Sequence, residues 1–154
     1  MIRYVIAVLL TSAIFAIAFV AVEHGSTVRA ETQLDGELTK LESAAVSLVE
    51  NDDPVPGEQE PPRRTVDVQL PTEEFASKSV DTLVLEPMND TNYTQVRYSF
   101  DGQHERASTI HAPLVNAASE HQHIDLSRAT GVHTLRLELV HDRDYSLVVA
   151  VTVG

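Results

Sequence analysis

The chain begins with an uninterrupted apolar run. From Tyr4 to Val22 there is no charged residue, no Gly and no Pro. A helix rises about 1.5 Å per residue, so this run spans roughly 28 Å, close to the thickness of a bilayer's hydrocarbon core. An α-helix satisfies its backbone hydrogen bonds within the segment, which a membrane requires. The pattern therefore predicts a transmembrane anchor over residues 1–22.

The charges at the two ends of the run predict its orientation. Arg3 precedes it and Glu23 follows it, so the positive-inside rule places the N-terminus in the cytoplasm and the C-terminal part outside. A cleaved signal peptide is the alternative, because Val28-Arg29-Ala30 offers small residues at the two positions that a signal peptidase reads. The apolar core of a signal peptide is usually about 7 to 15 residues. We therefore expect a retained anchor, with the rest of the chain exported in either case.

A second apolar pattern follows at helical spacing. It predicts an amphipathic stalk over residues 23–50, with Asp35, Glu37, Lys40 and Glu42 on other faces. The helix-packing stripe consists of Leu34, Leu38, Leu41, Ala45 and Leu48.

Two questions about this stalk stay open from the sequence. Gly25 and Gly36 each weaken a helix by about 1 kcal/mol relative to Ala, so the anchor and the stalk form either one kinked rod or two separate helices. The stripe packs either on the chain's own C-terminal domain or on another helix in an oligomeric seam. Fewer than three heptads form a weak basis for a coiled coil.

The pattern changes again after the stalk. Residues 51–64 contain four Pro and one Gly without an apolar period, which predicts an extended linker and a domain boundary. From residue 65 the period becomes two, which is typical of strands. The expected strands cover 65–70, 80–87, 93–100, about 103–110, 131–140 and 145–154.

Several local signals refine this prediction. Asp101-Gly102 predicts a tight hairpin with both central residues at positive φ, and the last run is apolar on both faces, which indicates a central strand. Residues 112–128 are expected to hold a short helix or a long loop. The predicted fold class is α+β: a transmembrane helix and amphipathic stalk followed by a small antiparallel β-sandwich over residues 65–154.

Composition excludes several functions. The chain has 23 acidic and 11 basic residues, a formal charge of -12 and no Cys. The negative field disfavours a nucleic-acid partner. Without Cys, the chain can form neither disulfides nor thiolate metal sites.

Few residue patterns suggest chemistry. Two Asn-x-Thr sequons at Asn89 and Asn92 precede an expected strand and are candidate N-glycosylation sites in an exported domain. His121 and His123 would share a strand face, but no pattern specifies the further ligands that a metal site needs. The sequence contains neither G-x-S-x-G nor H-E-x-x-H. We expect a non-enzymatic protein with no cofactor and no bound metal.

The apolar helix over residues 4–22, its amphipathic continuation to about Glu50 and the C-terminal β-domain together resemble a type IV pilin or pilin-like subunit. In that family the apolar helix packs in the filament core and the β-domain faces outward. The acidic composition, with only two Lys among the basic residues, resembles that of proteins from halophilic archaea. The resemblance implies a pilin-like or secretion-associated membrane protein whose partners are the membrane, other envelope proteins and further copies of itself.

The expected function is therefore that of an accessory or pilin-like subunit of an envelope assembly. The alternative is a tethered or secreted β-sandwich module that binds a solute or polymer. Such a module needs an aromatic-lined groove, and the chain has four Tyr, four Phe and no Trp.

Overall fold

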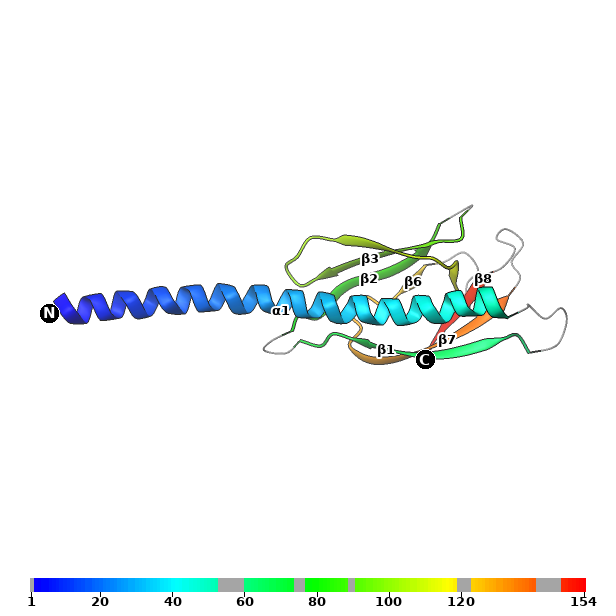
Figure 1. Cartoon of the computed structure of the whole chain (residues 1–154), viewed down its shortest axis with the longest axis horizontal. Coiled ribbons are helices and arrows are strands. Elements are labelled where there is room, and N and C mark those ends of the chain that lie inside the picture. The colour runs from blue at the N-terminus through cyan, green and yellow to red at the C-terminus, as the bar shows by residue number, and fades with distance from the viewer. Residues whose placement is uncertain (1, 53–59, 74–76, 89–90, 119–122, 141–147) are drawn as a thin grey trace.

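One helix and two sheets make up the fold of the part of the chain that the structure describes (Figure 1). The computed structural model describes residues 2–52, 60–73, 77–88, 91–118, 123–140 and 148–154. Helix α1 (Ile2–Asn51) runs 50 residues without a break. The anchor and the stalk are thus a single rod, because the helical hydrogen bonding continues through Gly25 and Gly36.

The strands form two four-stranded sheets. The first sheet is ordered β1 (Arg63–Leu70), β7 (Gly131–Val140), β8 (Val148–Val153) and β5 (Leu114–Asn116). The second is ordered β4 (Arg106–Ile110), β3 (Thr94–Phe100), β2 (Val80–Pro87) and β6 (Ile124–Asp125). The chain passes from the first sheet to the second after β1, back at β5, across again at β6, and ends on the first sheet.

The C-terminal half of α1 lies along the side of the two sheets where the edge strands β1 and β4 are found (Figure 1). Its stripe belongs to one hydrophobic core that also contains inward side chains of both sheets, such as Leu85, Leu114 and Leu137. The five stripe residues are at most 7% exposed. Of the two partners that the sequence left open, the structure shows the chain's own β-domain.

The predicted fold class is shown, and several strands have the expected bounds. β2 covers the expected 80–87 and β7 the expected 131–140. β8 lies between β7 and β5, as its two apolar faces predict. Val148, Val149, Ala150 and Val151 are all buried.

Three local expectations were wrong. β5 pairs with β8 in parallel, so the first sheet is mixed; the intervening β6 and β7 give the long connection that a parallel pair requires. A short helix or a long loop was expected over residues 112–128, but the described residues of this range, 112–118 and 123–128, include two short strands, β5 and β6. Of the pair Asp101-Gly102, only Gly102 has a positive φ, of 71°, because β4 starts at Arg106 and the longer connection needs only one left-handed residue.

Candidate functional site

The N-terminal half of α1 is an apolar surface that the described part of the chain leaves uncovered. Its large side chains are mostly exposed, as in Tyr4 at 78% and Phe19 at 73%. A stretch of 18 residues in this part of the helix has a mean hydropathy of 2.8, and none of these residues is buried. The hydroxyls of Thr11 and Ser12 donate to carbonyls one turn earlier, those of Ala7 and Val8, at 2.8 and 2.9 Å. Length and composition suit a membrane span, and a signal sequence shares both properties.

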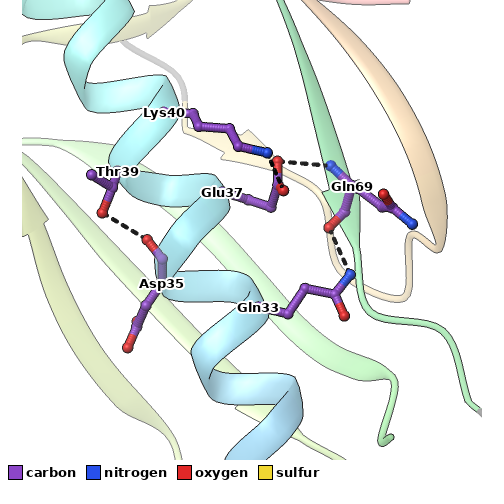
Figure 2. Close-up of polar contacts among 6 residues, drawn as sticks. All are labelled: Gln33, Asp35, Glu37, Thr39, Lys40 and Gln69. Atoms are coloured by element: carbon purple, nitrogen blue, oxygen red, sulfur yellow. Dashed lines mark hydrogen bonds and ion pairs between the residues drawn. The ribbon is translucent and has the colours of Figure 1, made fainter.

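On the β1 side, two polar side chains of α1 bind one residue of the edge strand (Figure 2). The Gln69 backbone N–H donates to the Glu37 carboxylate at 3.2 Å, and the Gln33 amide donates to the Gln69 carbonyl at 3.3 Å. The Lys40 ammonium lies 2.6 Å from the other Glu37 oxygen. Glu37 is only 7% exposed, so these contacts satisfy a buried carboxylate and also occupy the edge of β1.

On the β4 side, two acidic residues of α1 bind the second sheet. The Glu31 carboxylate lies 2.6 Å from the Arg106 guanidinium. Eleven residues later along the helix, Glu42 accepts a hydrogen bond from the His111 backbone N–H at 3.0 Å. The His111 ring nitrogen Nδ1 lies 2.5 Å from the same Glu42 oxygen. The helix is therefore held to both sheets by side chains on its two flanks.

These contacts perturb the acidity of Glu42. Burial acts to raise its pKa, but the backbone and ring hydrogen bonds from His111 and the charge of that ring act against it. The net result is a pKa of Glu42 below its ordinary value. The ionised carboxylate is thus favoured in the folded chain.

A cleft of about 320 Å³ lies where α1 emerges from the β-domain. It is lined by Val20, His24, Thr27, Val28, Glu31, Gln103 and Arg106. Because Arg106 already pairs with Glu31, the cleft presents no free cluster of charge.

Of the remaining sequence-predicted residues, the structure describes Asn92 and His123. Asn92 is exposed in the connection between β2 and β3, whereas Asn89 lies outside the described residues. His123 is exposed and His121 also lies outside the described residues. Within the described ranges, no group of three His, Asp or Glu residues is placed to hold a metal ion.

Sequence reasoning missed the polar contacts that hold the helix. Glu37 was expected on a polar face, but it lies three residues after Leu34 and four before Leu41, a spacing that puts it at the edge of the stripe. That spacing was a usable signal. The Glu31–Arg106 and Glu42–His111 pairs join residues more than sixty positions apart, and no local pattern indicates them.

Comparison with known proteins identifies a family without assigning an activity. No curated protein and no solved structure matches the chain. A family model described as a domain of unknown function, DUF7311, matches residues 1–153. This match covers the helix and both sheets together. The chain therefore belongs to the DUF7311 family.

Proposed function

We propose that this protein is a non-enzymatic, single-pass protein of the cell envelope that acts as a pilin-like or accessory subunit of an envelope assembly. The N-terminal half of α1 crosses the membrane with its N-terminus in the cytoplasm, and the β-domain lies outside. One observation carries the proposal: a single unbroken helix is bare and apolar over its first half and docked on the β-domain over its second.

The bare half requires a partner. Side chains such as Ile2, Phe15 and Ile17 are at least 70% exposed, and contiguous apolar surfaces of this extent on proteins mark membrane or protein contacts. Arg3 precedes the segment, which supports the proposed orientation. Lipid, other apolar helices or both would cover this surface.

The docked half supports a role in assembly. Ser26 is already 8% exposed and lies four residues past Val22, about 6 Å along a helix. The β-domain therefore begins almost where the apolar segment ends. Any packing of the bare segment against another helix would place the attached domains beside each other.

Cysteine labelling tests the topology, because the native chain has no Cys. We would place single cysteines at Ile2 and at the exposed Ser108 and treat intact cells with a membrane-impermeant maleimide. The expected result is labelling of Ser108→Cys only, with Ile2→Cys labelled after the cells are opened. Labelling of Ile2→Cys alone in intact cells would reverse the orientation, and recovery of the mature chain without its N-terminal segment would replace the anchor by a signal peptide.

Cysteine scanning tests the assembly separately. Single substitutions between Ala7 and Ala21, oxidised in the native membrane, should give cross-linked species at positions that recur with the helical period. Because a disulfide needs a thiol on each side, the partner in each species is a second copy or an envelope protein with its own cysteine, and mass spectrometry identifies it. If no position cross-links, packing against a second copy through this segment fails while the anchor remains.

A further inference from the structure

The sequon Asn92-Tyr93-Thr94 is a candidate modification site. We propose that Asn92 carries an N-linked glycan that is attached before the β-domain folds. This rests on the proposed function in one respect, that the β-domain lies outside the cytoplasm, where a glycan acceptor must be.

The acceptor side chain is well placed. Asn92 is exposed in the connection between β2 and β3, and no described residue covers it. The connection is held together by its own hydrogen bonds, from the Met88 N–H to the Tyr93 carbonyl at 3.0 Å and from the Thr91 N–H to the Met88 carbonyl at 3.3 Å. A glycan on Asn92 would project into solvent without displacing the core.

The site is also remote from the membrane. The Tyr93 ring contacts the His111 ring at a centroid distance of 5.2 Å, and His111 binds Glu42 of the helix. Glu42 lies twenty residues past Val22, which is about 30 Å along a helix. Figure 1 shows this end of β2 and β3 at the opposite end of the molecule from the N-terminus. A glycan here would not obstruct contacts made through the apolar segment.

Thr94, the third residue of the sequon, is buried, whereas Asn92, the first, is exposed. Thr94 is 0% exposed. Its hydroxyl donates to the Ala112 carbonyl and accepts from the Leu114 N–H, both at 2.8 Å. Thr94 also pairs with Pro87 of β2 and with Ile110 of β4.

This burial determines when the modification is feasible. A Ser or Thr at the third position makes the motif an acceptor, so the transferase must contact that side chain. In the folded domain that contact would require Thr94, the first residue of β3, to leave its hydrogen bonds to Ala112 and Leu114 and its place in the core. Asn92 can therefore accept a glycan on the exported chain before β3 pairs with β2 and β4, but not after the domain has folded.

The chemistry is a glycosyl transfer from a lipid-phosphate-linked sugar. The Asn92 amide nitrogen forms a bond to the anomeric carbon while the bond from that carbon to the phosphate oxygen breaks. The lipid phosphate leaves with the electron pair and takes up the proton that the amide nitrogen loses. The rest of the side chain is unchanged.

The first test is the intact mass of the full chain from its native membrane, in a Thr91→Val background that removes the Asn89 sequon. We expect a mass increase that disappears in Asn92→Gln and persists in Thr94→Ser, which keeps the sequon and the hydroxyl. An unmodified Asn92 would overturn the proposal. If Ser108→Cys is still labelled from outside, the failure belongs to the glycan alone; if it is labelled only from inside, the proposed topology has failed.

The second test addresses timing. The full chain, made folded and unmodified in a host without the transferase, is given to membranes that contain the transferase and its lipid-linked sugar. A synthetic peptide of residues 88–98 carrying Thr91→Val serves as the unfolded acceptor. We expect at least tenfold less transfer to the folded Thr91→Val chain than to the peptide. Equal transfer to both would refute attachment before folding.

Discussion

Truncation of Leu34 tests how firmly the helix is docked. Leu34 is fully buried, at 0% exposure, in the core that α1 shares with both sheets. Leu-to-Ala substitutions at such positions remove transfer free energy and leave a cavity, at a cost of about 2 to 5 kcal/mol. Because this site lies between a rigid helix and two sheets, little collapse is expected, and we predict about 3 kcal/mol for Leu34→Ala.

The matched control is Val28→Ala. Val28 lies on the same helix, but 47% of it is exposed, so its truncation should cost no more than about 0.5 kcal/mol. Both variants keep the apolar segment over residues 4–22, and both should remain in the membrane fraction.

The assay is urea unfolding of the full chain in a mild detergent, followed by the fluorescence of the tyrosines. Tyr98 is a suitable probe, because it is 7% exposed and its ring lies 5.9 Å from that of Phe100. At an m-value of about 1 to 3 kcal/mol per molar urea, Leu34→Ala should lower the midpoint by about 1 to 3 M. Equal midpoints for Leu34→Ala and Val28→Ala would refute the docked arrangement.

Four further substitutions probe the polar contacts of the helix. Glu37→Ala leaves the Gln69 N–H without its carboxylate partner and should lower the free energy of unfolding by about 1 to 3 kcal/mol. Lys40→Ala removes an exposed partner of the same carboxylate and should lower it by less than about 1 kcal/mol. If Lys40→Ala lowered the urea midpoint more than Glu37→Ala, the role given to Glu37 would be contradicted. Because the pKa of Glu42 is lowered in the folded chain, its ionised form adds stability above its ordinary value of 4.5, and this contribution is lost as the pH falls below 4.5 towards the folded-state pKa. The difference in urea midpoint between the native chain and Glu42→Gln should therefore shrink from pH 5 to pH 3, and a constant difference would argue against the His111 contact. Arg106→Gln should lower stability by less than about 1 kcal/mol, since the Glu31–Arg106 pair is half-exposed on its Arg side; a loss above about 2 kcal/mol would show that the pair is a principal attachment of the helix.

The sequence predicted those parts of the fold that depend on local periodicity. The change from a period of 3.6 to a period of 2 separated α1 from the strands, and the strand expected over residues 80–87 has the bounds of β2. The stripe was visible because each of its members lies three or four residues from the next. These features are properties of neighbouring residues, which is why a single sequence contains them.

The remainder depends on contacts between distant residues. β5 and β6 have three and two residues, too few to show a period, and the parallel β5–β8 pair is decided by the path of the chain between the sheets. The sequence shows the sequon at Asn92, but it does not indicate that Thr94 is buried. The groups that bind the Thr94 hydroxyl, at Ala112 and Leu114, lie in a distant part of the sequence. A motif can thus be read from the chain while the state in which it is accessible is set by the fold.

The unbroken course of α1 through Gly25 has a rotational consequence. An α-helix turns by about 100° and rises about 1.5 Å with each residue, so the direction in which the β-domain faces is geometrically tied to the face that the apolar segment turns towards its neighbours. One residue inserted between Val22 and Ser26 would swing the domain by about 100° about the helix axis while lifting it by only about 1.5 Å. Such an insertion should leave membrane retention intact but change which domain surfaces cross-link between adjacent molecules. In this molecule the rotation of the apolar segment about its axis therefore determines the direction in which the β-domain faces.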